Sequence, residues 1–158
     1  MSEVYKMNFI ISKANFNDTN EINNMLTCLI QDERKNYDNN INEKYKVKNF
    51  YEKYTENKDM CILVAKQNDT ILGYIYGYIQ DNGTLLNKIV AQLDALFVKQ
   101  EYRGNGIAKK LMNEFYNWAK KKEAAYIELS VCKDNSNAID LYENEGFNIN
   151  KICLRKEL

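Results

Sequence analysis

Histidine and proline are both missing from this chain of 158 residues, and its formal net charge is zero. Without histidine, neither a Ser–His–Asp triad nor a Cys–His pair can form. Proton transfer would therefore fall to carboxylate, tyrosine, lysine or water. The 22 basic and 22 acidic side chains cancel, which argues against a general attraction to nucleic acid or to an anionic membrane surface.

Cysteine is scarce, and the four cysteines, Cys28, Cys61, Cys132 and Cys153, are far apart in the sequence. Zinc sites need closer spacing, such as Cys-x-x-Cys, and usually histidine as well. We therefore expect no metal site. We expect each cysteine to be a buried, reduced residue with a structural role.

Long apolar runs are also missing. No uninterrupted run approaches the roughly 20 residues that a membrane span needs, and residues 1–13 lack the apolar core of a signal peptide. We expect a cytoplasmic protein with neither a membrane nor a nucleic-acid partner. The length predicts a single domain covering residues 1–158.

The segment from residue 91 to residue 110 is the most informative part of what is present. An apolar strand there runs through a loop carrying Gly104 and Gly106 into a helix. The first N–H groups of a helix have no partner within it, and the helix dipole favours negative charge beside them. The glycines allow a ligand to approach the main chain, and Arg103 adds donors suited to phosphate. The pattern indicates a phosphate-bearing cofactor; the alternative is a plain strand-to-helix connection.

Two large classes of phosphate-binding loop do not fit this segment. A Walker loop needs Gly-x-x-x-x-Gly-Lys followed by Ser or Thr, which the chain lacks. The dinucleotide fingerprint would need a third glycine where the chain has Lys109. Another phosphate-binding class is therefore favoured.

The periodicity of apolar residues predicts a mixed sheet with helices on its faces. The pattern Asp18-x-x-Glu21 is typical of a capping box that opens a helix, Asn68-Asp69 of a hairpin turn, and Gly146 of a helix end. Residues 31–48 are polar and are expected to form a mobile loop. Strands are expected at 8–13, 60–66, 71–80, 89–98, 125–132 and 147–156, and helices from 18 to about 30, at 43–54, 107–122 and 136–145.

Two further patterns have a structural and a functional interpretation. Tyr74, Tyr76 and Tyr78 alternate, so they share one face of a strand. That face is either half-buried sheet surface or a wall facing a substrate. The triple lysine at 120–122 is better explained as the solvated end of a helix, where cations favour the dipole, than as a nucleic-acid patch.

Two motifs resemble signatures of the GNAT superfamily of acetyl-CoA-dependent N-acetyltransferases. Arg103-Gly-Asn-Gly-Ile-Ala108 matches the pyrophosphate motif Arg/Gln-x-x-Gly-x-Gly/Ala, with Ala in the last position. The segment 135–147, NSNAIDLYENEGF, resembles the second signature, Asn-x-x-Ala-(x)-x-x-Tyr-x-x-x-Gly-Phe. The resemblance implies an α/β (α+β) GNAT fold, with a mixed central sheet of about six to seven strands flanked by about four helices.

The resemblance also implies a set of cofactor-binding residues. Asn135 would contact the pantetheine arm of acetyl-CoA, and one backbone N–H of the central strand would polarise the thioester carbonyl. Backbone groups of Leu96, Phe97 and Val98 would pair with that arm. The pyrophosphate would be bound by Arg103, Gly104, Asn105, Gly106, Ile107, Ala108 and Lys109.

Two residues are candidates for catalysis. By motif position Tyr142 would be the general acid, because a phenol with a pKa near 10 is protonated at neutral pH and can serve a departing thiolate; the alternative is packing. Asp94 interrupts an apolar strand, where carboxylates are disfavoured. It would accept a proton from the attacking amine or attract a cation, unless it forms a structural ion pair with a lysine.

The implied reaction is transfer of an acetyl group from acetyl-CoA to a primary amine in a ternary complex, with no metal. We expect a small-molecule substrate such as a polyamine, an amino acid or an aminoglycoside. Carboxylates and phenols in the expected acceptor region suit a cation. They are Asp32, Glu33, Tyr37, Asp38, Tyr74 and Tyr76. The alternatives are a protein lysine or N-terminal acceptor, and a non-catalytic acyl-CoA sensor. A homodimer is an option that the sequence leaves open.

Overall fold

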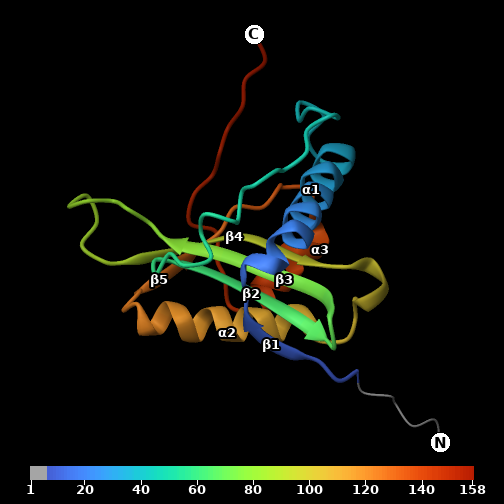
Figure 1. Cartoon of the computed structure of the whole chain (residues 1–158). Helices are drawn as coiled ribbons and strands as arrows, with labels where there is room; N and C mark the ends of the chain where they lie inside the picture. Colours follow the sequence, from blue (N-terminus) through green and yellow to red (C-terminus); the bar gives the residue numbers. More distant parts are fainter. Residues whose placement is uncertain (1–6) are drawn as a thin grey trace, which may run out of the picture.

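The computed structural model describes residues 7–158, and its strands form a single five-stranded sheet in the order β1-β2-β3-β4-β5 (Figure 1). Neighbouring strands are antiparallel, except that β4 and β5 are parallel. The strands are β1 Ile10–Lys13, β2 Met60–Gln67, β3 Thr70–Ile79, β4 Val90–Val98 and β5 Tyr126–Glu128. The helices are α1 Thr19–Asn36, α2 Ile107–Lys121 and α3 Ser136–Asn144, with short 3-10 turns at Phe16–Asp18 and Gln100–Tyr102.

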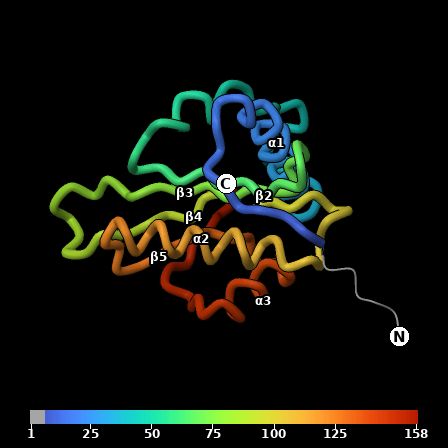
Figure 2. The backbone as a smooth tube through the Cα atoms, turned by 60° about the horizontal axis from the view of Figure 1, so that its bottom comes forward, coloured from blue at the N-terminus to red at the C-terminus, as the bar shows by residue number. Residues whose placement is uncertain are grey.

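Helices lie on both faces of the sheet, as the alternation of apolar residues predicts (Figure 2). The apolar stripe of α2, which includes Leu111 and Phe115, packs on one face and is fully buried. On the other face, Ile22 and Met25 of α1 pack against Tyr74. The mixed α/β architecture is therefore confirmed.

The β2–β3 hairpin forms at the predicted turn. Asn68 has a φ of 53°, a left-handed conformation that asparagine tolerates better than most residues. The hairpin pairs Met60 with Tyr78 at its open end. The three alternating tyrosines of β3 pack on the side of the sheet covered by α1.

A β-bulge interrupts the pairing of β3 with β4 and singles out Asp94. Tyr76 is opposite Ala95, but the next residue, Gly77, is opposite Leu93, so Asp94 is the extra residue of β4. A Cβ at Gly77 would lie 2.3 Å from the Gln92 carbonyl oxygen, and the Phe115 ring would be almost as close. Glycine is therefore required at the bulge, which re-aims the neighbouring carboxylate.

The parallel partner of β4 is short, and this opens the sheet. Only Val90, Ala91 and Gln92 pair with β5. Beyond Gln92 the two strands separate, so the second half of β4 has a free edge on the β5 side while β3 still pairs with its other edge.

The prediction for residues 31–54 is wrong in two respects. Helix α1 continues to Asn36, so the polar stretch is not all loop, and no helix forms over 43–54. Side chains of α1 satisfy the backbone of that segment instead. Gln31 donates to the carbonyl oxygens of Asn42 and Tyr45, and Thr27 Oγ1 accepts the N–H of Val47.

Asp18 does not cap α1 as the sequence pattern suggests. Its carboxylate accepts the backbone N–H of Asn15 at 3.0 Å, in a capping box that opens the preceding 3-10 turn. The other carboxylate oxygen pairs with Lys66 on β2 at 2.6 Å. Asp18 therefore ties the start of α1 to the sheet.

The last third of the chain has fewer strands than predicted. The strand expected over 125–132 is limited to β5, and the strand expected over 147–156 does not form. The described residues accordingly contain five strands and three α-helices, against the six to seven strands and four helices expected. Lys121 ends α2 and Gly146 follows α3 with a φ of 90°, as predicted.

Two expectations about burial need correction. Tyr74 and Tyr76 are buried under α1 and the segment that follows it, so they form neither a half-buried surface nor a substrate wall. Cys61 is buried, but Cys28 and Cys153 are exposed. Burial raises the pKa of the Cys61 thiol to about 12.

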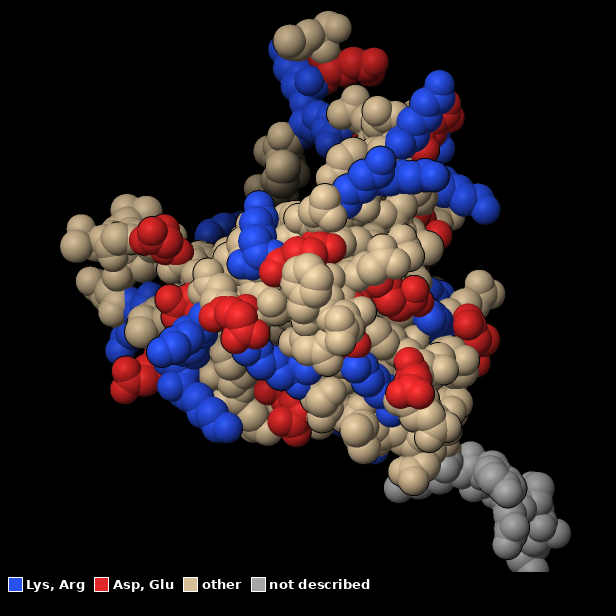
Figure 3. Space-filling view, in the orientation of Figure 1, with Lys and Arg blue, Asp and Glu red and all other residues tan. Residues whose placement is uncertain are grey.

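No helix among residues 7–158 is long and apolar enough to cross a membrane. The prediction about a signal peptide falls partly on residues 1–6, which lie outside the described residues. Figure 3 shows acidic and basic side chains interspersed over the visible face, in keeping with the balanced composition.

Candidate functional site

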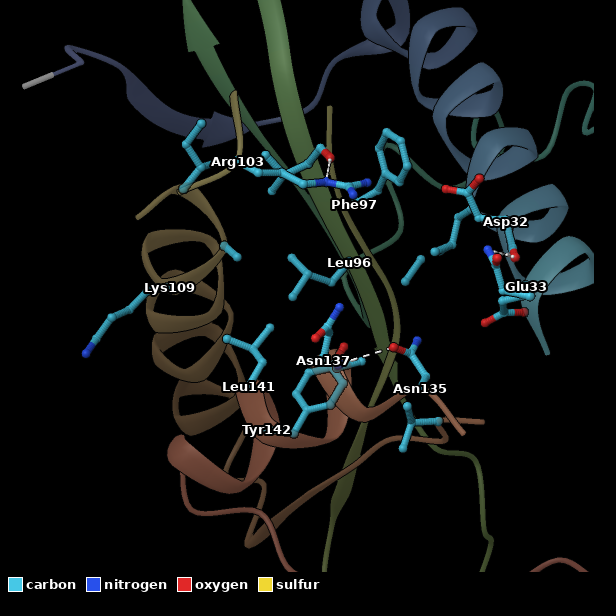
Figure 4. Close-up of a pocket in the computed structure, with 18 of the residues that line it drawn as sticks. Asp32, Glu33, Leu96, Phe97, Arg103, Lys109, Asn135, Asn137, Leu141 and Tyr142 are labelled. Atoms are coloured by element: carbon cyan, nitrogen blue, oxygen red, sulfur yellow. Dashed lines mark hydrogen bonds between the residues drawn. The ribbon is translucent and has the colours of Figure 1, made fainter. Parts of the chain in front are cut away.

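A cleft of about 520 Å³ opens where β4 and β5 separate (Figure 4). Its floor is the second half of β4, and its walls are the C-terminal part of α1, the N-terminus of α2 and one side of α3. Of the acceptor-region residues that the sequence suggested, Asp32, Glu33 and Tyr37 line the cleft, and Asp38, Tyr74 and Tyr76 do not. Nearly all of the catalytic and cofactor-binding candidates line it. They are Asp94, Leu96, Phe97, Val98, Arg103, Gly104, Gly106, Ile107, Ala108, Lys109, Asn135 and Tyr142.

The N-terminus of α2 forms one end of the cleft and carries uncapped backbone donors. The first helical hydrogen bond runs from the Lys110 N–H to the Gly106 carbonyl, so the three preceding N–H groups have no partner within the helix. Gly106 occupies the N-cap position and supplies no capping side chain. Gly104 and Gly106 have φ values of 78° and 76°, and the space where a Cβ would stand is open at both. The backbone N–H groups of residues 107–109, together with Gly104 and Gly106, form a cradle whose chemistry suits an anion.

Arg103 lies across the end of β4 rather than over the helix N-terminus. Its Nε donates to the Val98 carbonyl oxygen at 2.9 Å, and its guanidinium carbon lies 5.9 Å from the centre of the Phe97 ring. These contacts fix the side chain beside the cleft. The terminal guanidinium nitrogens make no hydrogen bond to the described residues.

Two of the predicted phosphate-binding residues direct their side chains elsewhere. Asn105 Nδ2 donates to the carbonyl oxygens of Tyr102 and Arg103, and this residue does not line the cleft. The Lys109 side chain points away from Tyr142 in Figure 4, and its Nζ lies 4.0 Å from Glu145. Only the backbone of Lys109 faces the cradle.

The free edge of β4 presents backbone groups to the cleft. Lys99 donates its N–H to Leu72 on β3, and backbone directions alternate along a strand. The N–H and C=O groups of Leu96 and Val98 therefore point away from β3, whereas those of Phe97 point toward it. The Val98 carbonyl already accepts Arg103 Nε, so within the described residues both groups of Leu96 and the N–H of Val98 remain free. Phe97 contributes its side chain to the cleft, and the predicted backbone role suits Leu96 and Val98 alone.

Tyr142 is held on the opposite wall by the way α3 ends. The Gly146 N–H donates to Glu143 and the Phe147 N–H to Tyr142, which is the Schellman pattern that a left-handed glycine allows. The Tyr142 and Phe147 rings meet edge to face, with centroids 5.7 Å apart. The motif glycine and phenylalanine therefore position the tyrosine.

The environment of Tyr142 keeps its phenol protonated. Desolvation, with a smaller contribution from the Glu33 carboxylate, raises the pKa of Tyr142 to about 12. Glu33 reaches the cleft from α1 and was proposed from sequence only as part of a broad acceptor region. Its own pKa is raised by burial, then by the charges of Asp38 and Asp94.

Asp94 lies on the floor of the cleft at the bulge. Its side chain reaches solvent, but the surrounding walls remove part of its hydration and so raise the pKa of the carboxyl. No lysine or arginine among the described residues forms an ion pair with it. The structural alternative for Asp94, an ion pair with a lysine, is therefore absent from this part of the chain.

Asn135 combines a capping role with a position on the cleft wall. Its Oδ1 accepts the Ala138 N–H at 3.2 Å, which caps α3, and its Nδ2 makes no hydrogen bond within the described residues. Asn137 and Leu141 also line the cleft (Figure 4). The sequence reasoning missed Asn137, although it lies inside the second motif.

The described residues contain no cluster of three or more metal-ligating side chains.

A family model described as the acetyltransferase (GNAT) family matches residues 26–147 of the chain. The matched region includes every candidate residue of the cleft.

Curated proteins and a solved structure resemble the chain. The N-terminal acetyltransferase B complex catalytic subunit NAA20 of Arabidopsis thaliana is 35% identical over 86 residues, 54% of this chain and 48% of that protein. The thialysine N-epsilon-acetyltransferase of Sus scrofa is 33% identical over 81 residues, 51% of this chain and 46% of that protein. The chain thus spans about half the length of these two relatives. A tetramutant of the BH1408 protein from Bacillus halodurans has the same fold, with a TM-score of 0.83 at 19% identity over 94% of this chain and 99% of that one.

Proposed function

Because the chain belongs to the acetyltransferase (GNAT) family, we propose that residues 1–158 form one domain that transfers an acetyl group from acetyl-CoA to a primary amine. One observation carries the proposal. The free edge of β4 leads directly to the uncapped N-terminus of α2, and Tyr142 faces that edge from the other wall.

The cleft fits the parts of coenzyme A in order. The N–H groups of Ile107, Ala108 and Lys109 suit the diphosphate, and the open space at Gly104 and Gly106 lets it approach. The N–H and C=O of Leu96 and the N–H of Val98 suit the amides of the pantetheine arm. When bound, acetyl-CoA supplies a thioester whose carbonyl carbon the amine attacks.

Tyr142 acts at the leaving group. As the new N–C bond forms, the C–S bond breaks and the electron pair goes to sulfur. With a pKa of about 12, the phenol is a poor acid toward a thiolate near 8.5, and full transfer would cost about 5 kcal/mol. Tyr142 therefore contributes mainly as a hydrogen-bond donor to the developing thiolate, with the proton following as coenzyme A leaves.

Asp94 acts on the amine. An alkylammonium has a free pKa near 10.4 and must lose a proton before it attacks. Asp94 relays that proton toward solvent, directly or through water, and does not retain it, because a carboxyl with an ordinary pKa of 3.8 is a far weaker base than the amine. The unpaired carboxylate also attracts the cationic form into the cleft.

A small cationic amine is the acceptor that the cleft favours. Asp94, Asp32 and Glu33 line the end of the cleft away from the cradle, and no basic side chain among the described residues neutralises any of them. The resemblance to the thialysine acetyltransferase supports this choice. The resemblance to NAA20, a subunit of an N-terminal acetyltransferase complex, favours a peptide N-terminus as the second candidate.

Mass spectrometry can separate these acceptors. The protein is incubated with acetyl-CoA and either pooled polyamines, amino acids and aminoglycosides or a peptide library, and products heavier by one acetyl group are identified. Acetylated small amines support the first choice, and acetylated peptides support the second. Binding of coenzyme A without transfer to any amine would indicate an acyl-CoA sensor and contradict the proposed reaction.

A further inference from the structure

The C-terminal segment, residues 147–158, contacts the rest of the chain mainly through polar groups. It forms neither helix nor strand, and Ile152 and Leu154 are largely exposed. Asn150 and Lys151 hold it to Glu128 at the end of β5. Farther along, the segment reaches the end of α1, on the acceptor side of the cleft.

The contact at α1 is a two-pronged ion pair. Arg155 Nη1 donates to Asp38 Oδ1 at 3.1 Å and Nη2 to Oδ2 at 2.9 Å, joining residues 117 apart in the chain. A planar guanidinium holding both carboxylate oxygens fixes the geometry as well as the charge. This hydrogen bonding holds the pKa of Asp38 below its usual value.

Asp38 is closely connected to the acidic wall of the cleft. The N–H groups of Tyr37 and Asp38 both donate to the Glu33 carbonyl oxygen, at 2.8 and 2.9 Å. Glu33, Asn36 and Tyr37 line the cleft. A clamp on Asp38 therefore restrains the C-terminal end of α1 and Tyr37, which present these side chains.

We propose that Arg155 is a positioning residue, which holds the acidic end of α1 in the geometry that receives a cationic acceptor. This inference rests on the proposed function for its consequence in catalysis, but the clamp itself can be measured in the free protein. Arg155 does not line the cleft and acts only through Asp38.

Charge gives the clamp a second effect. Glu33 faces acidic or neutral groups from each neighbouring element: Asp38 after α1, Asp94 on β4, Tyr142 on α3 and Cys132 in the loop before α3. Arg155 is the cation that offsets Asp38. Its removal leaves the Asp38 charge uncompensated, which raises the pKa of Glu33 further.

The test compares Arg155→Ala with the control Lys156→Ala. The control also removes one positive charge, but Lys156 forms no ion pair among the described residues. Hydrogen exchange should become about three- to tenfold faster at the Tyr37 and Asp38 amides in Arg155→Ala alone. NMR titration of the Glu33 carboxyl should show a higher pKa in Arg155→Ala alone. Arg155→Lys keeps the positive charge but cannot make the two-pronged contact. It should therefore bring the pKa of Glu33 closer to the wild-type value than it brings the exchange rates of the Tyr37 and Asp38 amides.

Spermidine serves as the kinetic probe, at saturating acetyl-CoA. Arg155→Ala should raise the KM for spermidine about threefold or more and change kcat less than twofold, while Lys156→Ala changes neither. If the wild-type protein acetylates no amine, the proposed function fails while the exchange and titration results still decide the clamp. Equal exchange and equal Glu33 titration in the two alanine variants would overturn the inference.

Discussion

The two ends of the cleft present different kinds of chemical group, backbone groups at one end and side chains at the other. At the α2 end, backbone N–H groups and two left-handed glycines form the cradle. At the α1 end, the lining consists of side chains, and the carboxylates of Glu33 and Asp94 come from elements 61 positions apart in sequence. The groups at the α2 end are backbone dipoles held in place by the fold, and those at the α1 end are charged side chains that can change rotamer.

This difference predicts separate effects of substitutions at the two ends of the cleft. Backbone donors stay in place as long as the strand–loop–helix path is kept, whatever the neighbouring side chains are. Side-chain carboxylates can be replaced without altering that path. We therefore expect substitutions at the α2 end to affect coenzyme A binding and substitutions at the α1 end to affect the amine.

The largest effect should come from Gly106→Ala. The added methyl would stand where the diphosphate approaches, and we expect about 100-fold weaker coenzyme A binding, equivalent to losing about one hydrogen bond to a charged group. Calorimetry measures the affinity. Gly83→Ala is the matched control, because Gly83 also has a positive φ and open space around it but does not line the cleft. Equal affinities in the two variants would contradict the cradle.

Tyr142→Phe should lower kcat at least tenfold, because the developing thiolate loses its hydrogen-bond donor. Coenzyme A affinity should change less than twofold, because the substitution removes only a hydroxyl group that lies away from the diphosphate site. Tyr116→Phe is the control, since Tyr116 also has a pKa raised to about 12 but does not line the cleft. Unchanged turnover in Tyr142→Phe would remove the tyrosine from the mechanism.

Asp94→Asn should lower kcat/KM about tenfold and remove the limb of the pH–rate profile on which activity rises with pH.

The same substitution, Asp94→Asn, should stabilise the fold. A carboxyl whose pKa is raised in the folded state destabilises it once ionised, so stability is lost as pH rises above the ordinary value of 3.8. Asp94→Asn should therefore have a Tm higher by about 1–3 °C at pH 8 and by less at pH 5. An unaltered pH–rate profile would exclude the base role.

The smallest effect is expected from Glu33→Gln. Loss of the Glu33 charge should raise the KM for spermidine about threefold at low salt and less at high salt, because salt screens the contact between this carboxylate and the cationic substrate. It should also lower the pKa of Tyr142, which the Glu33 charge now raises; NMR titration of the labelled tyrosine rings, with the Tyr142 signal assigned from Tyr142→Phe, measures this. A Tyr142 titration identical to that of the wild type would show that the two groups do not face each other.

The cradle end could be predicted from sequence because its information is local. Gly104 and Gly106 define the loop within six residues, and Gly146 with Phe147 fixes Tyr142 within one helix end. Side-chain directions were harder to predict. Asn105 lies in the pyrophosphate motif and Lys109 directly follows it, yet their side chains contact neighbouring groups instead.

The acceptor end depends on contacts that periodicity does not reveal. Residues 43–54 have a helical pattern, but bonds from Gln31 and Thr27 hold the backbone in turns. The bulge at Asp94 depends on how Gly77 meets Phe115, a contact between distant segments. The alternation that predicted a strand over 147–156 says nothing about whether an edge is available to pair with it.

A crystal structure with coenzyme A bound would test the central claim most directly. We predict diphosphate oxygens within hydrogen-bond distance of the Ile107, Ala108 and Lys109 N–H groups, and a pantetheine arm paired with Leu96 and Val98 on the free edge of β4. A coenzyme A molecule seated elsewhere, with these backbone groups left to solvent, would contradict the account.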